Sequence, residues 1–209
     1  TPDTLPVTET SSVKKSLSPY GNTKQVAEEI LEDNCKADRH LKVISLRYFN
    51  PIGAHPSIKI GETAKGIPQN LLPYLTQTVI GKREFLSVFG NDYNTPDGTC
   101  IRDYIHVMDL AYAHVCAIER MLHMGSDINY EVFNVGTGKG YSVLEIIQTF
   151  EKVTGMKVNF QFKGRREGDI AQIWADTSLA NKVLKWEALY ALEDMLLSAW
   201  KWEKELAKS

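Results

Sequence analysis

The stretch from Leu41 to Phe49 constrains the fold most, because it reads as a buried strand that directly follows a helix. Its centre is β-branched and apolar, and Asn50-Pro51 ends it. A helical face precedes it and reaches about Cys35, formed by Val26, Ala27, Ile30, Leu31 and Asn34. A helix followed by a strand is half of a βαβ unit, so the chain is predicted to be α/β with a parallel sheet.

The rest of the chain continues the same alternation. Apolar periodicity predicts helices at residues 69–79, 109–122, 142–153, 178–184 and 192–204, and strands at 86–89, 130–135 and 158–162. Asp109 is expected to cap its helix, and Ser142 with Glu145 has the pattern of a capping box. Residues 51–66 have no period and predict a long loop of the functional or mobile kind, and residues 1–15 also read as loop.

Composition excludes several classes of protein. The net charge is −2 and no basic run is present, so we expect no nucleic-acid partner. No apolar run approaches the length of a membrane span, so no membrane is expected. The three cysteines, Cys35, Cys100 and Cys116, are widely spaced, which predicts reduced thiols and a cytoplasmic protein. The five histidines show no metal-ligand spacing, so no metal site is expected.

Tyr20 and Lys24 form the first candidate site. Ser18 can cap a helix whose first turn accepts Pro19, and residues four apart share one face of a helix. An ammonium beside a phenol stabilises the phenolate, which makes a tyrosine usable in proton transfer near neutral pH. The alternative is that the Tyr20 ring packs on the domain and Lys24 is a solvated lysine. Because this spacing arises often by chance, it does not by itself distinguish a catalytic pair from a packed tyrosine beside a surface lysine.

Gly136 to Gly140 lies between a predicted strand and a predicted helix and invites comparison with phosphate-binding loops. The sequence Gly-Thr-Gly-Lys-Gly matches neither G-x-x-x-x-G-K-[ST] nor G-x-G-x-x-G. A tight turn that needs positive φ is therefore the favoured interpretation.

Arginines in two charged loops, Arg102 and the Arg165-Arg166 pair, are candidates for gripping a diphosphate, because the guanidinium fork suits phosphate oxygens. The equal alternative is that each pairs with a neighbouring carboxylate, Asp103 or Asp169. In α/β sheets ligands sit at the carboxyl ends of strands, so a site is also expected at residues 47–50. Caps and turns would explain Asn50 and Asn70 equally well.

Several segments together resemble the UDP-glucose 4-epimerase (UDP-galactose 4-epimerase) family of the extended short-chain dehydrogenase/reductase superfamily. They are SPYGNTK (18–24), LRYFNPIGAHP (46–56), IGE (60–62), GIPQNLLPY (66–74), VFGNDY (88–93), DGTCIRDYIHVMDL (97–110), FNVGTGKGYSV (133–143) and RREGD (165–169). The Tyr-x-x-x-Lys spacing marks only the superfamily. RYFNPIGAHP together with DGTCIRDYIHVMDL distinguishes epimerases from sugar-nucleotide dehydratases and decarboxylases.

The resemblance implies a role for each matching residue. Tyr20 would be the acid/base, Lys24 would hold the nicotinamide ribose of NAD and favour ionisation of the phenol, and Tyr48 and Phe49 would lie near the nicotinamide. The residues implied to bind the UDP-sugar are Asn50, Asn70, Leu71, Ser87, Val88, Phe89, Arg102, Tyr104, Arg166 and Asp169, with Ile173 at the hexose.

The family's chemistry implies an isomerase of galactose metabolism. Tyr20 would take the O4 proton of a UDP-hexose as hydride passes from C4 to NAD. The 4-keto sugar then turns over and is reduced from its opposite face. NAD is regenerated in each cycle and acts as a prosthetic group.

The same resemblance implies a fold made of the C-terminal part of a Rossmann-type sheet and a smaller α/β substrate-binding domain. Residues 1–50 would end the NAD-binding domain and residues 51–209 would mainly bind the UDP-sugar, with about 109–135 returning to the Rossmann domain. The family's first part, with its glycine-rich NAD loop and an active-site serine, is absent from this sequence. We therefore expect a fragment that is inactive alone, and a homodimer at full length.

Ile173 departs from the bulky tyrosine that restricts N-acetylated sugars in the family. The expectation is that the full-length enzyme also accepts UDP-N-acetylhexosamines. Two other function classes are retained: a related NAD-dependent nucleotide-sugar dehydratase, and a non-catalytic nucleotide-sugar-binding fragment.

Overall fold

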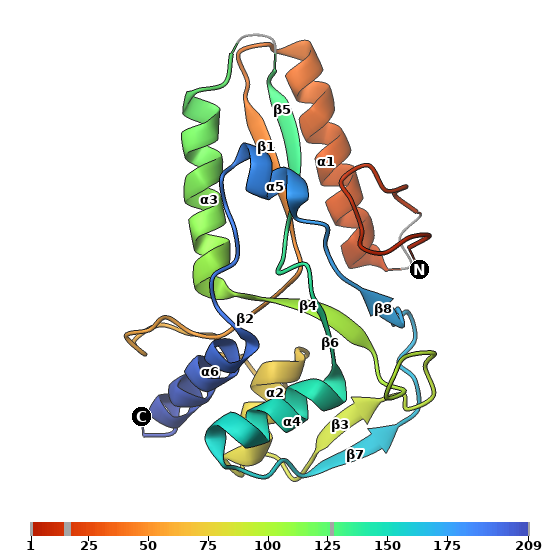
Figure 1. Cartoon of the computed structure of the whole chain (residues 1–209), viewed down its shortest axis with the longest axis vertical. Helices are drawn as coiled ribbons and strands as arrows, with labels where there is room; N and C mark the ends of the chain where they lie inside the picture. Colours follow the sequence, from red (N-terminus) through yellow and green to blue (C-terminus); the bar gives the residue numbers. More distant parts are fainter. Residues whose placement is uncertain (1, 15–17, 126–127, 209) are drawn as a thin grey trace.

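The computed structural model describes residues 2–14, 18–125 and 128–208, so Thr1 and Lys15 at the ends of the predicted opening loop lie outside it. Single helices alternate with pairs of consecutive strands along the described chain, and two helices end it (Figure 1). The helices are α1 (Pro19–Ala37), α2 (Leu71–Val79), α3 (Val107–Leu122), α4 (Val143–Thr154), α5 (Ser178–Val183) and α6 (Leu192–Leu206). The strands are β1 (Val43–Tyr48), β2 (Asn50–Ile52), β3 (Leu86–Phe89), β4 (Ile101–His106), β5 (Tyr130–Val135), β6 (Gly140–Ser142), β7 (Phe160–Lys163) and β8 (Gln172–Ile173).

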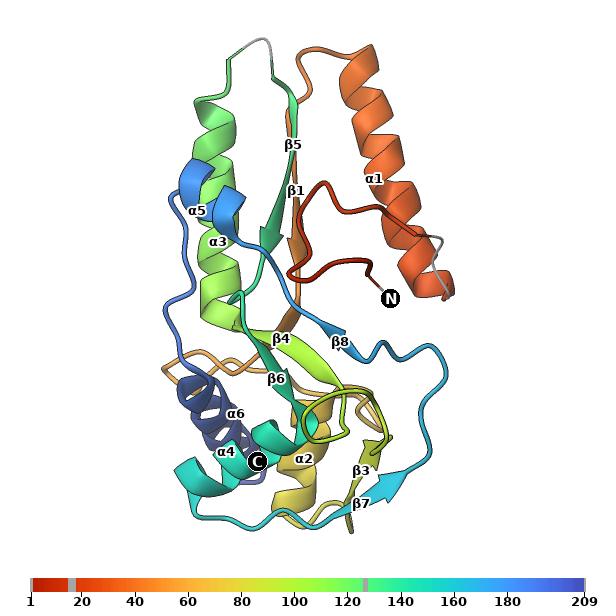
Figure 2. The same ribbon diagram turned by 45° about the vertical axis from the view of Figure 1, so that its right-hand side comes forward.

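One end of the molecule is built on a parallel pair of strands, β1 and β5. Their register runs from Val43 opposite Tyr130 to Tyr48 opposite Val135. Helices α1 and α3 lie on opposite sides of this pair in both views (Figures 1 and 2). Its buried apolar cluster joins α3, β5 and α5 and includes Phe133 and Trp186. Each strand therefore reaches its carboxyl end at the middle of the molecule.

The other end packs α2, α4 and α6 against short strands. The parallel pair β3–β7 and the β2–β4–β6 sheet surround a second buried cluster that includes Leu75, Phe150 and Trp200. Parallel pairing and covering helices confirm the predicted α/β class. Among the described residues, no helix has the length and apolar character needed to cross a bilayer.

Strand β4 is the central connection, and the sequence analysis did not predict it. β2 and β8 pair with it in parallel, and β6 pairs with it in the antiparallel direction. Asp103 and His106 interrupt its apolar pattern, yet they are 0% and 1% exposed. Their partners come from distant segments, so local periodicity could not reveal the strand.

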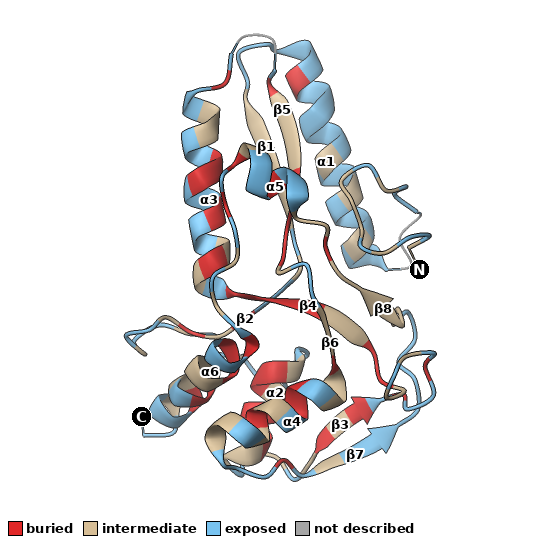
Figure 3. Cartoon of the chain, viewed as in Figure 1, coloured by how far each residue is buried: buried red, intermediate tan, exposed pale blue. Residues whose placement is uncertain are grey.

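The helix predicted to reach about Cys35 is present as α1, but its apolar face is exposed. Val26, Ile30 and Leu31 are 41%, 55% and 38% exposed, and Cys35 is the one buried residue of this helix. Figure 3 shows α1 largely in the colour of exposed residues, in contrast to the inner faces of α2 and α4. The helical period was correct, but within the described chain nothing apolar covers this face.

Helix ends follow the local sequence in most cases. Ser18 caps α1 by accepting a hydrogen bond from the Gly21 N–H, and the Ser142–Glu145 capping box at α4 is confirmed. The cap predicted at Asp109 is wrong, because α3 begins at Val107 with His106 as its cap. The Asp109 carboxylate instead accepts hydrogen bonds from the backbone N–H groups of Leu189 and Tyr190, so it fixes the approach to α6.

The long loop after β1 begins with strand β2 and then packs on α6. The Trp202 indole donates a 2.9 Å hydrogen bond to the Glu62 carbonyl. The Asn70 side chain in turn donates to the Glu62 carboxylate at 3.2 Å. These contacts place Asn70, the residue before α2, beside the carboxyl ends of β1 and β2.

Candidate functional site

Two adjoining cavities lie where β1, β2 and β4 meet. The smaller has a volume of about 390 Å³ and the larger about 1080 Å³. Four residues line both cavities, namely Asn50, Pro51, Asn70 and Arg102, so the two form one continuous cleft. Every predicted catalytic, cofactor-binding or substrate-binding residue lines one or both cavities except Lys24, and the candidate Arg165 also lies outside both.

The larger cavity is bordered by Tyr20, Tyr48, Phe49 and Ile173. Tyr48 and Phe49 come from the carboxyl end of β1, because the strand runs directly into the cleft. The opening segment lines the same cavity. Val7 holds it there by donating to the Trp174 carbonyl at 2.9 Å and accepting from the Asp176 N–H at 2.7 Å.

Lys24 lies beside Tyr20 rather than in the cavity wall. Its ammonium nitrogen is 5.1 Å from the centroid of the Tyr20 ring, one helical turn away. The Tyr20 side chain is 71% exposed, so its hydroxyl is accessible from the cleft. The two side chains are neighbours, as their spacing predicts, and their catalytic role stays a prediction. Lys24 is exposed, as the alternative expected, but the Tyr20 ring is not packed on the domain.

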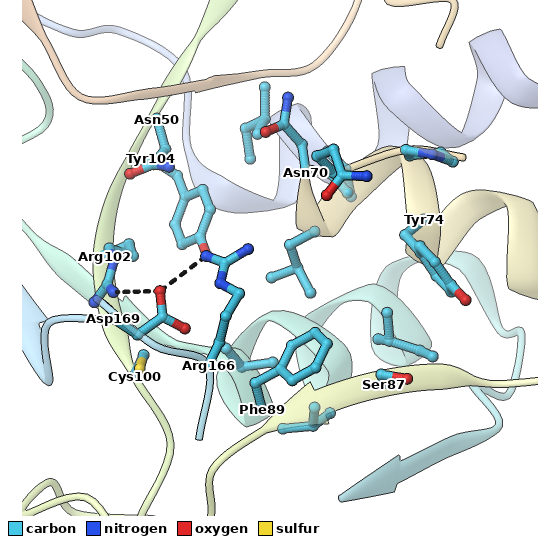
Figure 4. A pocket seen from close by; sticks show the side chains of 18 of the residues that line it. Asn50, Asn70, Tyr74, Ser87, Phe89, Cys100, Arg102, Tyr104, Arg166 and Asp169 are labelled. Atoms are coloured by element: carbon cyan, nitrogen blue, oxygen red, sulfur yellow. Dashed lines mark hydrogen bonds and ion pairs between the residues drawn. The ribbon is translucent and has the colours of Figure 1, made fainter. Parts of the chain in front are cut away.

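The smaller cavity is lined by residues from several segments that are far apart in the sequence (Figure 4). Its predicted lining residues are Asn50, Asn70, Leu71, Ser87, Val88, Phe89, Arg102, Tyr104, Arg166 and Asp169. The Tyr104 ring is 4% exposed, and burial raises the pKa of its phenol, so Tyr104 stays neutral. The cavity therefore offers aromatic rings, amides and two guanidinium groups to one ligand.

Asp169 lies between the two arginines of this cavity, as Figure 4 shows. Arg166 donates to its carboxylate at 2.8 Å, and Arg102 is 3.7 Å away. Of the two carboxylates considered as partners, Asp169 faces the arginines and Asp103 does not. Arg165 pairs with Asp92 instead, at 2.8 Å. Two positive groups and one negative group thus converge at one end of the cleft.

The turn at Gly136 is not available to a phosphate. Its amides are taken by the buried Asp103 carboxylate, which accepts from the N–H groups of Thr137 at 2.9 Å and Gly138 at 3.1 Å. The Thr137 hydroxyl and the Ala175 N–H add bonds of 2.6 and 3.2 Å. Burial raises the pKa of Asp103, and these hydrogen bonds oppose that shift. The tight-turn interpretation is confirmed.

Sequence reasoning missed some lining residues. Cys100 and Tyr74 line the smaller cavity, and Arg47 lines the larger one with most of the opening segment. Cys100 lies directly before strand β4. Because that strand was not predicted, nothing in the sequence indicated that Cys100 faces the cavity. Arg47 lay in the stretch 47–50 expected at the strand end, and that position was its only signal.

The sequence pattern of the GDP-mannose 4,6-dehydratase family matches residues 1–198, and the chain belongs to that family.

The chain is similar in sequence to curated UDP-glucose 4-epimerases. That of Bacillus subtilis is 52% identical over 97% of this chain, and that of Drosophila melanogaster is 47% identical over 98%. These matches confirm the resemblance inferred from the motifs.

Solved structures agree. The Stenotrophomonas maltophila UDP-glucose 4-epimerase, crystallised with NAD and formylated UDP-arabinopyranose, superposes with a TM-score of 0.94 at 46% identity over 99% of this chain. The Bifidobacterium longum enzyme, with NAD+ and UDP, gives 0.92 at 45% identity over 98%. The chain spans 58% of the length of the two curated relatives and 60% of these two structures.

Proposed function

We propose that the native protein containing this chain interconverts UDP-galactose and UDP-glucose by reversible epimerisation at C4, with NAD as its cofactor. One observation carries the proposal. A continuous cleft has Tyr20 with Lys24 at one end and Arg102, Arg166 and Asp169 at the other. A nucleotide sugar is a ligand of this kind, with an anionic diphosphate between a base and a neutral hexose.

The smaller cavity binds the UDP part. Arg102 and Arg166 pair with the diphosphate, because guanidinium groups bind phosphate oxygens through charge-assisted hydrogen bonds. Asp169 accepts from ribose hydroxyls while keeping the two arginines in place. Phe89, 41% exposed, presents a ring face to the base. The remaining contacts come from Asn50, Asn70, Leu71, Ser87, Val88 and Tyr104.

The larger cavity binds the hexose and the nicotinamide end of NAD. Its volume of about 1080 Å³ and its donor set fit such a group: the Tyr20 hydroxyl with the nearby Lys24 ammonium for ribose hydroxyls, and the Tyr48 and Phe49 rings for a flat heterocycle. When bound there, NAD supplies a reversible two-electron acceptor for C4 of the sugar.

The protein's own contribution at the reacting end is proton transfer. Tyr20 accepts the proton of the sugar 4-hydroxyl when C4 is oxidised and returns it when C4 is reduced. Lys24 stabilises the phenolate through its positive charge. Ile173 borders the hexose, and its aliphatic side chain leaves room for an N-acetyl group.

The wider expectations remain proposals of the same kind. Residues 1–50 belong to the NAD-binding domain and 51–209 mainly to the sugar-binding domain. Residues 109–135 return to the first, a division supported by the pairing of β5 with β1. The native protein is a homodimer of the cytoplasm, an expectation supported for the compartment by three unpaired cysteines.

The test supplies UDP-galactose and NAD to the native protein and follows UDP-glucose with a coupled assay. We expect epimer formation, and loss of at least about 100-fold in kcat for Tyr20→Phe, since general acid–base catalysis contributes that much. Affinity for UDP should stay within about twofold in this variant. A stable 4-keto-6-deoxy product would instead identify a dehydratase, and binding without turnover would identify a non-catalytic nucleotide-sugar-binding protein.

A further inference from the structure

Helix α1 carries Tyr20 and Lys24 but has little apolar attachment to the rest of the described chain. Its one buried residue, Cys35, lies in the last turn. Near that end, the Asn129 side chain donates to the Cys35 carbonyl at 2.6 Å. No side chain in the first turns of the helix is buried. Within the described chain, the contacts nearest the Tyr20 end are polar, and they begin with the Gln25 side chain, which donates to the Lys14 carbonyl at 2.6 Å.

The strongest of those contacts joins Glu28 to Arg47 of strand β1. The Arg47 guanidinium donates to one Glu28 oxygen at 2.9 Å through Nε and to the other at 2.6 Å through Nη2. Both side chains are half-buried, at 28% and 29% exposure. Two parallel bonds fix the angle between the groups as well as their distance.

Arg47 also ties this contact to the cleft. Its Nη1 donates to the Glu9 carbonyl at 3.0 Å, so one guanidinium holds the helix, the strand and the opening segment together. Arg47 lines the larger cavity and directly precedes Tyr48 and Phe49. Figure 2 shows the opening segment between α1 and the β1–β5 pair.

The spacing Tyr20, Lys24, Glu28 places the three side chains along one winding face of α1. Each step of four residues advances about 6 Å along the axis and about 40° around it. Holding Glu28 therefore sets the rotation of the helix two turns away, where the Tyr20 hydroxyl meets the cleft.

We propose that Glu28 and Arg47 are positioning residues, which aim Tyr20 and Lys24 at the sugar. This inference rests on the proposed function for its kinetic consequence, and on geometry alone for the orientation of Tyr20. A displacement of reacting groups by about 1 Å can cost about 100-fold in rate, so loss of this pair should be visible in kcat.

The chain contains a matched control. Arg120 of α3 donates to Glu131 of β5 through Nε at 3.0 Å and Nη2 at 2.9 Å. This pair also joins a helix to the central strands, with side chains 31% and 16% exposed. Neither residue lines either cavity. Removing the Arg120–Glu131 pair should lower the free energy of unfolding about as much as removing the Glu28–Arg47 pair, without changing the orientation of Tyr20.

The experiment compares Glu28→Gln with Glu131→Gln in the native protein, since glutamine keeps the size of the side chain and one acceptor oxygen. We expect Glu28→Gln to lower kcat by about tenfold or more and to change the pH profile of kcat, while the Kd for UDP stays within about twofold. Glu131→Gln should retain kcat. Equal losses in the two variants, or an unchanged kcat and pH profile in Glu28→Gln, would overturn the proposal.

A second readout does not depend on activity. Fluorotyrosine placed at position 20 reports its surroundings through its fluorine resonance. Glu28→Gln should shift or broaden that resonance, and Glu131→Gln should leave it unchanged. If the wild-type protein makes no epimer, the proposed function fails while this comparison still decides the positioning role. An unmoved resonance in Glu28→Gln would refute that role.

Discussion

The guanidinium of Arg102 lies 3.7 Å from the carboxylate of Asp169, and the two side chains are 18% and 14% exposed. Because this contact is longer than a hydrogen bond, the Arg102 guanidinium can donate hydrogen bonds to a phosphate oxygen of the ligand while it stays near Asp169. Its removal leaves Asp169 paired with Arg166 at 2.8 Å and takes one positive charge away from the ligand. Arg102 should thus matter for phosphate and little for the nucleoside.

Arg102→Met should weaken UDP binding by about 10- to 100-fold, the equivalent of a charge-assisted hydrogen bond of about 1.5–3 kcal/mol. Isothermal titration with UDP and with uridine, which lacks phosphate, separates the effects. Uridine affinity should change by less than about threefold. Equal losses for both ligands would contradict a diphosphate contact at Arg102.

Ile173→Tyr should lower the ratio of UDP-N-acetylglucosamine turnover to UDP-glucose turnover. Ile173 lines the same cavity as Tyr20, so a larger ring there reduces the space beside the sugar. Ile173→Val keeps that space and serves as the control. The ratio of the two kcat/KM values is the measurement, and an unchanged ratio in Ile173→Tyr would defeat the hypothesis.

Acid should destabilise the protein through His106. Its Nδ1 accepts from the Met108 N–H at 3.0 Å, which assigns the proton to Nε2, 3.2 Å from the Ser198 hydroxyl. Burial lowers the pKa of His106, although Asp109 and Asp194 oppose the shift. An unfolded histidine titrates near pH ~6.5, so stability is complete above that value and falls as the pH drops toward the folded pKa.

Urea unfolding between pH 8 and 5 measures this loss, which amounts to about 1.4 kcal/mol for each unit by which folding lowers the pKa. His106→Asn should show a shallower pH dependence than wild type, at a lower absolute stability. Parallel curves for the two proteins would assign the acid sensitivity to other groups.

Asp103→Asn should destabilise the fold by about 2–3 kcal/mol, because an amide NH₂ would face backbone donors that now bond to a carboxylate. Thr137→Val keeps the backbone bonds to Asp103 but removes the hydroxyl bond to Asp103 and two 3.3 Å contacts with the Lys139 backbone, and it should cost about 1 kcal/mol. Denaturant titration compares the variants. Similar losses in both would show that the backbone contacts contribute little.

The sequence predicted those parts of the fold that local patterns determine. The α4 capping box needed only Ser142 and Glu145, and the carboxyl end of β1 followed from Leu41 to Asn50. Strand β4 was missed because its buried polar side chains interrupt the apolar pattern: the partners of Asp103 are all far along the chain, and His106 reaches Ser198 as well as the nearby Met108. The pairing of Arg166 with Asp169 is local, but choosing Asp169 over Asp103 as the partner of Arg102 needed long-range information.

For helix α1, the sequence pattern predicted the helix but could not predict how far its apolar face is buried. Val26, Ile30 and Leu31 have the period of a helix that packs inward, but periodicity identifies a face without identifying what covers it. In the candidate site, nearly all the residues singled out by the motifs line the cleft, but the opening segment, which forms much of the wall of the larger cavity, was not predicted to belong to it. The contacts that orient them, such as Arg47 with Glu28, belong to two different elements and leave no pattern in the sequence.

The Asp103 carboxylate in the Gly136 turn has a consequence for how this region responds to its surroundings. A phosphate-binding loop whose N–H groups bind an anion from solution is ordered only when the concentration of that anion is high enough for it to bind. Here the anion is part of the chain, so its effective concentration at the turn is fixed by covalent connection. The junction of β4, β6 and β8 is therefore assembled before any substrate arrives, whatever the supply of phosphate in solution.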